Sequence, residues 1–250
     1  MLLENKIVII TGASSGIGAA AAKLFANEGA KLVLGARRSE LLENVTDDIC
    51  GKGGEAVFLA GDVEDGHYAA ELVLLAEKTF GRLDGAFNNA GTTGDMGPIP
   101  DMADDTWHKV ISVNLNSGFH AAKHQIPAMR KHGGGSIVFT SSFVGHTIGL
   151  PGMGAYAAAK AGLIGLTQVL AVEHGTDKIR VNALLPGGTK TQMAGDHPGT
   201  HDWISGLHAL KRMADPSEIA QAALFLISDQ ASFVTGSAMI ADGGNSINKT

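Results

Sequence analysis

The feature that most constrains the fold is an alternation of short apolar runs with longer Ala- and Leu-rich segments along the 250-residue chain. Short apolar runs bounded by Gly, Asn or Asp are typical of buried strands, and the longer segments have the pattern of helices. Strands are expected at residues 6–10, 31–35, 56–60, 83–87, 136–142, 179–185 and 237–241. Helices are expected at residues 19–28, 39–50 with Ser39 as cap, 65–80, 104–131, about 156–174 and 214–228. The sequence therefore predicts an α/β fold, a doubly wound parallel sheet with helices on both faces, as a single domain over residues 1–250.

Polar turns that contain glycine follow the expected strands, at the edge where sheets of this kind bind ligands. After the first strand, Gly12, Gly16 and Gly18 let backbone N–H groups approach an anion, and the start of the next helix favours a phosphate. Their spacing, Gly-x-x-x-Gly-x-Gly, differs from the dinucleotide fingerprint Gly-x-Gly-x-x-Gly. By itself, this turn also fits an ordinary connection between a strand and a helix.

Charge and cysteine content restrict the class of partner. The formal charge is −6, and the basic residues form no cluster, so we expect neither nucleic acid nor an anionic membrane as a partner. Cys50 is the only cysteine, which excludes an intrachain disulfide and a zinc site built on several thiolates and fits a reducing compartment. The N-terminus lacks a signal-peptide pattern, and no apolar run is expected to reach membrane-spanning length. We therefore predict a cytoplasmic protein that acts on small molecules.

Tyr156 and Lys160 form a candidate acid–base pair. The segment between them is alanine-rich and should be helical, so a spacing of four residues places both side chains on one face. A phenol has an ordinary pKa of about 10, and a neighbouring ammonium favours the phenolate and lowers that pKa. The alternative is a core tyrosine beside a solvated lysine.

The segment 188–213 is long and weakly patterned, which is typical of a functional lid, and it is the expected substrate loop. His197, His201 and His208 lie in it and could contact substrate, although solvated loop histidines fit the pattern equally. His120 and His124 have the spacing of metal ligands. A third ligand is not evident from the sequence, and we expect no metal site.

Taken in order and spacing, the motifs resemble the short-chain dehydrogenase/reductase family over almost the whole chain. The matching residues are Thr11-Gly-x-x-x-Gly-x-Gly18, Asp62-Val63, Asn88-Asn-Ala-Gly91, Asn114, Ser142, Tyr156-x-x-x-Lys160, Pro186-Gly187 and Asp242-Gly-Gly244. The resemblance implies a Rossmann-type fold, a nicotinamide dinucleotide cofactor, interconversion of an alcohol and a ketone, and a homotetramer.

The resemblance also assigns cofactor contacts to positions along the carboxyl edge of the sheet. Around the pyrophosphate and adenosine ribose it implies Gly12, Ser14, Ser15, Gly16, Ile17 and Gly18; beside the adenine, Asp62 and Val63; and at the floor of the cleft, Asn89, Ala90 and Gly91. Against the nicotinamide carboxamide and phosphates it implies Pro186, Gly187, Thr189 and Thr191. Thr189 replaces a commoner Val or Ile, with little consequence if its contacts are through the backbone.

For catalysis, the resemblance implies that Tyr156 donates and accepts the proton, while Lys160 lowers its pKa and holds the nicotinamide ribose. Ser142 would bind the substrate oxygen, and Asn114 would hold a water in a proton relay behind Lys160. The interval from Ser142 to Tyr156 is one residue longer than the usual form, so Ser141 remains a contender for the serine role. Without the resemblance, Ser142 fits a plain strand end and Asn114 a solvent-facing helix position.

The end of the second expected strand points to the cofactor. Enzymes of this fold that prefer NAD usually carry an acidic residue there, whereas this chain has Ala36 followed by Arg37 and Arg38. A guanidinium can pair with a 2′-phosphate, so NADP(H) is favoured and NAD(H) stays possible. Two solvated arginines at a helix start are the alternative, although their charge is unfavourable beside the positive end of a helix.

Three functions are compatible with these residues. The leading prediction is an NADP(H)-dependent oxidoreductase acting on a secondary alcohol or ketone; the others are an NAD-dependent dehydrogenase of the same family and a non-catalytic dinucleotide-binding regulator. The helix around Tyr156 is apolar around much of its circumference and needs cover on all sides. We therefore expect a homo-oligomer that pairs this helix and the segment 104–131 across a two-fold axis.

Overall fold

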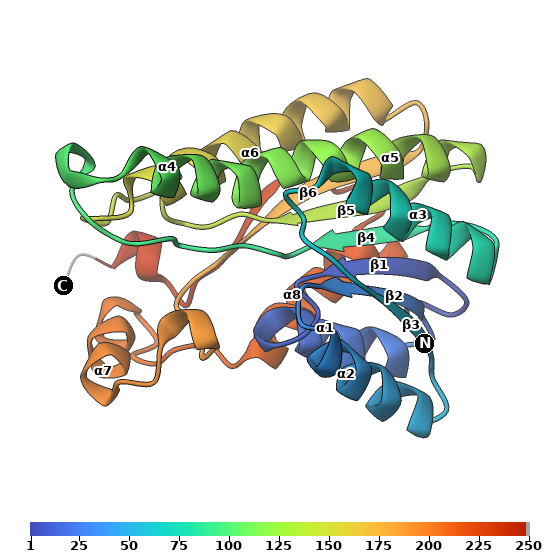
Figure 1. The fold of residues 1–250 in the computed structure, drawn as a ribbon, viewed down its shortest axis with the longest axis horizontal. Helices are drawn as coiled ribbons and strands as arrows, with labels where there is room; N and C mark the ends of the chain where they lie inside the picture. Colours follow the sequence, from blue (N-terminus) through green and yellow to red (C-terminus); the bar gives the residue numbers. More distant parts are fainter. Residues whose placement is uncertain (249–250) are drawn as a thin grey trace.

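The computed structural model describes residues 1–248, in which seven parallel strands form one sheet in the order β3-β2-β1-β4-β5-β6-β7 (Figure 1). The strands are β1 Ile7–Thr11, β2 Lys31–Ala36, β3 Glu55–Ala60, β4 Gly85–Asn88, β5 Gly135–Thr140, β6 Ile179–Pro186 and β7 Ala238–Ala241. Each lies within two residues of its expected bounds. The predicted α/β class and doubly wound parallel sheet are confirmed.

Helices cover both faces of the sheet because strand side chains alternate in direction. Val8 and Ile10 of β1 belong to one core, which lies under α1 (Gly16–Asn27), α2 (Ser39–Gly51) and α8 (Pro216–Ile227). Ile7 and Ile9 point to the other core, under α3 (Gly66–Phe80), α5 (Ser117–Lys131) and α6 (Gly154–His174). Figure 1 shows these two layers on opposite sides of the strands.

The strand order reverses at β1, which pairs with β2 on one side and with β4 on the other. At such a switch point the connections leave toward opposite faces, and a crevice opens beyond the carboxyl ends of the strands. The register pairs Thr11 of β1 with Asn88 of β4, so the turns after these two strands lie side by side. This geometry places the glycine turn next to the Asn89–Gly91 segment.

The expected helix over 104–131 is present without a break, but a π-helical turn, Ser112–Asn116, separates α4 (Asp104–Ile111) from α5. Within this turn, the Asn114 side chain donates a hydrogen bond to the Val110 carbonyl oxygen at 2.8 Å. A side chain bonded to the carbonyl four residues earlier competes with the helical backbone ladder. Single π turns of this kind occur often at functional sites.

Two other sequence expectations need correction. Ser39 is the first residue of α2 rather than its cap, and Arg38 occupies the N-cap position without a side-chain cap. The segment 188–213 is not wholly irregular, because it contains a 3₁₀ turn, Gln192–Ala194, and the helix α7, Pro198–Leu207. Figure 1 shows α7 standing to one side of the sheet, close to the chain's C-terminal end.

Helix α6 is also more apolar than expected. An 18-residue stretch of this 21-residue helix has a mean hydropathy of 1.4, which by length and composition alone would suffice to cross a membrane. A core helix passes the same test, so this composition is weak evidence for a membrane span. One side of the helix, which includes Leu163 and Leu170, packs into the core beneath β6, whereas Val169 and Val172 are exposed.

Candidate active site

The glycine turn after β1 has a backbone that only glycine adopts without strain. Gly12 and Gly16 have φ of +68° and +55°, and a Cβ on Gly18 would lie 2.2 Å from the Gly12 carbonyl oxygen. Ser15 precedes α1 in an extended conformation, and its side chain accepts no hydrogen bond from the first N–H groups of the helix. Free N–H groups at a helix start, without side chains in the way, suit a phosphate. The turn thus fits a dinucleotide pyrophosphate.

Thr11, at the end of β1, connects the glycine turn to the segment that follows β4. The Thr11 hydroxyl accepts hydrogen bonds from the backbone N–H of Asn89 at 3.1 Å and of Ala90 at 3.2 Å. A Cβ on Gly12 would lie 3.0 Å from the Ala90 Cα. The Asn89–Gly91 segment therefore lies against the glycine turn, and Thr11, which belongs to the matched motif but was not among the predicted contact residues, holds it there.

The two arginines lie beside the glycine turn in different environments. Arg38 donates hydrogen bonds to the hydroxyls of Ser14 (3.0 Å) and Ser15 (2.7 Å) and to the side-chain oxygen of Gln192 (2.8 Å). Arg37 lies 3.9 Å from the Asp62 carboxylate. A cation bound to the serines at the adenosine end of the turn suits a phosphate group. Gln192 was not predicted, because its partner is 154 residues away in the chain.

Tyr156 lies in the first turn of α6, and its phenol forms a hydrogen bond with the Ser142 side chain. The Lys160 ammonium lies 5.5 Å from the Tyr156 ring centre and donates to the Thr140 carbonyl oxygen at 2.6 Å. Lys160 is only 2% exposed, so the alternative of a solvated lysine is wrong. The helix therefore presents a phenol and a buried cation on one face, as the spacing of four residues predicts.

The pKa values in this cluster are set mainly by burial. Burial raises the pKa of the Tyr156 phenol, and the hydrogen bond from Ser142 lowers it by a smaller amount. Burial lowers the pKa of Lys160 to about 7. The sequence predicted that Lys160 lowers the pKa of Tyr156, whereas in the structure burial raises that pKa. Removal from water disfavours both charged forms, the phenolate and the ammonium.

The structure separates the two adjacent serines. The Ser141 hydroxyl is 1% exposed and donates to the Lys160 carbonyl oxygen at 2.7 Å, so it is used inside the fold. Ser142 instead bonds Tyr156 and accepts from the Val144 N–H at 3.1 Å. The geometry favours Ser142 over Ser141 as the serine that faces a substrate.

The Asn114 side chain lies close to Lys160 but forms hydrogen bonds with backbone groups. The amide donates to Thr92 O and Val110 O at 2.8 Å each and accepts from Thr92 N–H at 3.2 Å. A Cβ on Gly91 would lie 2.9 Å from the Asn114 side-chain oxygen and 3.4 Å from the Lys160 nitrogen. The side chain thus fixes the loop after β4 against Lys160, and the water relay stays a prediction.

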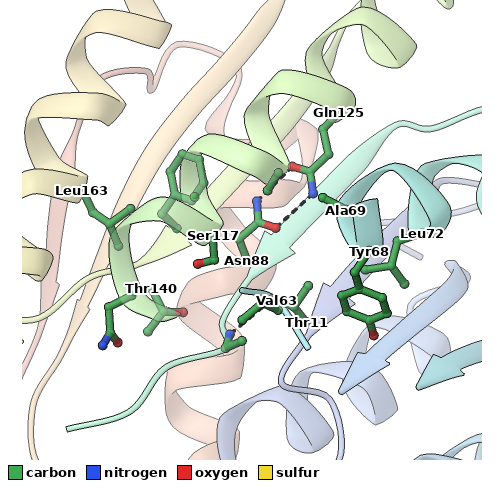
Figure 2. Close-up of a pocket in the computed structure, with 15 residues that line it drawn as sticks. Thr11, Val63, Tyr68, Ala69, Leu72, Asn88, Ser117, Gln125, Thr140 and Leu163 are labelled. Carbon is green, nitrogen blue, oxygen red and sulfur yellow. Dashed lines mark hydrogen bonds between the residues drawn. The ribbon is translucent and has the colours of Figure 1, made fainter. Parts of the chain in front are cut away.

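A small cavity lies behind this cluster, between α3, α5 and the ends of β1 and β4 (Figure 2). Its volume is about 20 Å³, and the paired amides of Asn88 and Gln125 lie on its wall at 2.9 and 3.0 Å from each other. Such a volume holds about one water molecule. Tyr68 lines the far side and donates its hydroxyl to Leu59 O at 2.7 Å, so the second tyrosine of the chain is part of the core.

The segment after β6 closes the crevice opposite the glycine turn. A Cβ on Gly16 would lie 3.0 Å from a Thr191 methyl carbon, which brings this segment against the start of α1. The Thr189 hydroxyl donates to Gly187 O at 3.0 Å. Pro186 ends β6 at the carboxyl edge of the sheet, and the predicted contacts of this segment with a cofactor stay a prediction.

The histidines flagged by spacing have other surroundings. His120 lies against Gly66, where a Cβ would be 3.0 Å from its ring nitrogen. Within residues 1–248, no group of three or more His, Cys, Asp or Glu side chains could hold a metal ion.

These elements point to a class of protein: an oxidoreductase with a Rossmann-like doubly wound sheet, and the comparisons with known proteins support it. The family model described as "Enoyl-(Acyl carrier protein) reductase" matches residues 12–246. The chain is 38% identical to cyclohexanol dehydrogenase of Acinetobacter sp. (strain SE19) over 96% of this chain and 94% of that protein. It is 40% identical to the A-factor type gamma-butyrolactone 1′-reductase of Streptomyces virginiae over 98% and 97%.

Among solved structures, carveol dehydrogenase from Mycobacterium avium in complex with NAD superposes with a TM-score of 0.94 at 32% identity, over 99% of each chain. The chain therefore belongs to the short-chain dehydrogenase/reductase family and is an oxidoreductase.

Proposed function

We propose that this protein interconverts a secondary alcohol and a ketone with NADP(H), with Tyr156 as the general acid and base. The observation that carries the proposal is the grouping of the Tyr156 phenol with the Ser142 side chain and the buried Lys160 ammonium, 5.5 Å from the Tyr156 ring centre. Cyclohexanol dehydrogenase and the butyrolactone reductase are named for this type of chemistry and support it.

Each residue has a role that its geometry allows. The N–H groups at Gly12, Gly16 and Gly18 would bind the pyrophosphate, and Lys160 would hold the nicotinamide ribose. The bound dinucleotide supplies or accepts the hydride. Ser142 would bind the substrate oxygen, and Tyr156 would give its proton to that oxygen in the reductive direction.

Because burial raises the pKa of Tyr156, the phenol is protonated at neutral pH, which is the form that donates to a carbonyl. Asn114 would position the loop at Lys160. The remaining predicted contacts, from Ile17, Asp62, Val63 and Thr191, stay part of this proposal.

Two alternatives remain open. An NAD-dependent dehydrogenase is favoured by the NAD bound in the carveol dehydrogenase structure. A non-catalytic dinucleotide-binding regulator is opposed by the Ser142–Tyr156 contact, which a regulator does not need. Oxidation of NADPH by a panel of simple and cyclic ketones, followed by absorbance, separates an enzyme from a regulator, and absence of turnover with every ketone and alcohol would contradict the proposal.

The cofactor preference gives a sharper prediction. A hydrogen bond from Arg38 or Arg37 to a 2′-phosphate predicts that kcat/KM favours NADPH over NADH by roughly ten- to hundredfold. In Ala36→Asp/Arg37→Ile, a carboxylate replaces the cation beside the ribose, and the preference should shift toward NADH. Steady-state kinetics with both cofactors measure it. Lys78→Ile, which removes one charge from the exposed side of α3, is the control.

A wild type that favours NADH contradicts NADP(H) as the cofactor, and a double mutant with unchanged preference contradicts the assignment of the preference to positions 36 and 37. The preference should also weaken at high salt, because both arginines are exposed and their interactions are screened.

We also propose a homotetramer in which α6 and the α4–α5 segment pair across a two-fold axis. Phe119 on α5 and Val169 and Val172 on α6 are 53%, 55% and 84% exposed. Apolar side chains in this density on neighbouring helices favour burial against another copy. Light scattering at micromolar concentration should report an oligomer, and Val172→Asp should shift it toward monomer. A wild-type monomer would contradict the proposal.

We further propose a cytoplasmic location and small-molecule carbonyl or alcohol partners. The exposed free thiol of Cys50 fits a reducing compartment.

A further inference from the structure

A buried histidine lies where the substrate loop meets the cofactor crevice. His208 follows α7 directly and is only 2% exposed, although histidines in loops are usually solvated. It takes no part in the chemistry proposed above. A polar ring buried at this point must be held by specific partners.

Both ring nitrogens of His208 have backbone partners. Nδ1 lies 2.7 Å from the Ile204 carbonyl oxygen on α7, and Nε2 lies 3.0 Å from the Gly188 backbone nitrogen. A carbonyl only accepts and an N–H only donates. The ring must therefore carry its proton on Nδ1 and leave Nε2 bare, which requires a neutral imidazole.

The ring also fills a slot that glycines leave open. A Cβ on Gly187 would lie 2.9 Å from Nε2, one on Gly188 would lie 2.9 Å from Cε1, and one on Gly243 would lie 3.2 Å from Cδ2. The slot is thus formed by the segment after β6 on one side and by the Asp242–Gly244 turn on the other. Side chains at the two segment glycines would collide with the ring.

Both backbone polar groups of Gly188, the N–H and the carbonyl oxygen, form hydrogen bonds. Its N–H donates to His208, and its carbonyl oxygen accepts from the Ala214 N–H at 2.9 Å. The orientation of this peptide sets the course of the chain from Pro186 to Thr191, the segment proposed to contact the nicotinamide carboxamide and phosphates. Its orientation consequently depends on α7, the helix of the substrate loop.

We propose that neutral His208 is a positioning residue, which locks α7 onto the Gly187–Gly188 peptide and so shapes the nicotinamide end of the crevice. The proposal rests on the proposed function, because it assigns that segment to the dinucleotide. The substrate loop and the proposed cofactor site are then coupled through one hydrogen-bond acceptor, Nε2 of His208.

Two conservative variants separate the two hydrogen bonds. In His208→Gln the side-chain oxygen can reach the position of Nε2 and accept from Gly188, whereas in His208→Asn the amide reaches only the position of Nδ1 and can donate to Ile204. The dissociation constant for NADPH, measured by titration without substrate, should rise about tenfold in His208→Asn and stay within about threefold of wild type in His208→Gln. His197→Asn, at the exposed start of α7, is the matched control.

Two measurements do not depend on turnover or on a bound dinucleotide. The ¹⁵N spectrum of the wild-type imidazole should show the proton on Nδ1, and amide exchange at Gly188 should accelerate in His208→Asn but not in His208→Gln. A ring protonated on Nε2 or on both nitrogens at neutral pH overturns the proposal, as does equal NADPH affinity or equal Gly188 exchange in the Asn and Gln variants. An inactive wild type that passes these tests would refute the proposed function and leave the role of His208 intact.

Discussion

Tyr156→Phe is expected to lower kcat by about 10²–10⁴-fold, the usual contribution of a positioned proton transfer, while the dissociation constant for NADPH changes little. The substitution removes one hydroxyl and keeps the ring that packs near Lys160. The hydroxyl that it removes is the group proposed to give its proton to the substrate oxygen, whereas Ser142 would remain to bind that oxygen. Steady-state kinetics and a binding titration on the same preparation measure both quantities.

Tyr68→Phe is the matched control, because it removes the only other tyrosine hydroxyl of the chain. That hydroxyl donates to Leu59 O, and Tyr68 lies on the opposite side of the small cavity from Thr140 (Figure 2). The control should lose about 1 kcal/mol of stability and keep its kcat. Tyr156→Phe activity within a few-fold of wild type would remove Tyr156 from the mechanism.

The sheet could be predicted because strands of a parallel sheet are buried on both faces and appear as short apolar runs. β1 and β2 are nearly wholly buried, and their Val, Ile and Leu content made their positions evident. The edges were less certain: β7 is only partly buried, yet the polar Asp242-Gly-Gly244 turn marked its end. Glycine positions were informative for the same reason, since Gly12 and Gly18 permit contacts that any Cβ would block.

Features that depend on contacts between distant residues could not be predicted. The π turn at Ser112–Asn116 arises because Asn114 bonds Thr92 and Val110, and helix propensity carries no signal for it. The Arg38–Gln192 contact joins residues far apart in the chain. His208 appeared as one of several loop histidines, and only the backbone partners on both sides of its ring give it a role.

The electrostatics of the site were the least predictable part. Spacing places a cation near a phenol, but the direction of a pKa shift depends on how much water both groups lose. In the structure, burial is the largest influence on both Tyr156 and Lys160. The sequence therefore predicted that Tyr156 and Lys160 lie side by side, but not the cost of burying them.

That cost can be measured at Lys160, whose pKa is lowered from 10.5 to about 7 by burial. Between these values the unfolded chain binds the proton more tightly than the folded protein does, so wild-type stability should rise as pH increases through this window and be lowest near and below pH 7. Lys160→Met removes the buried ammonium while filling similar volume. Replacing a buried charge by an apolar side chain is often stabilising, here by about 2 kcal/mol at pH 7 after loss of the bond to Thr140.

Lys160→Met should therefore be the more stable protein at neutral pH and nearly inactive, with kcat lower by about 10²-fold through loss of the group proposed to hold the ribose and support Tyr156. Urea unfolding at pH 7 and near pH 10, at one fixed protein concentration because an oligomer is expected, measures the stability difference. The difference should shrink toward the higher pH, because the free energy needed to deprotonate the lysine on folding falls as the pH approaches its ordinary pKa of 10.5. The exposed Lys78→Met is the control and should show a small difference at both pH values. A Lys160→Met protein that is less stable at pH 7, or whose advantage does not change with pH, would show that the ammonium is compensated within the fold, since an uncompensated buried charge must destabilise most where it is ionised.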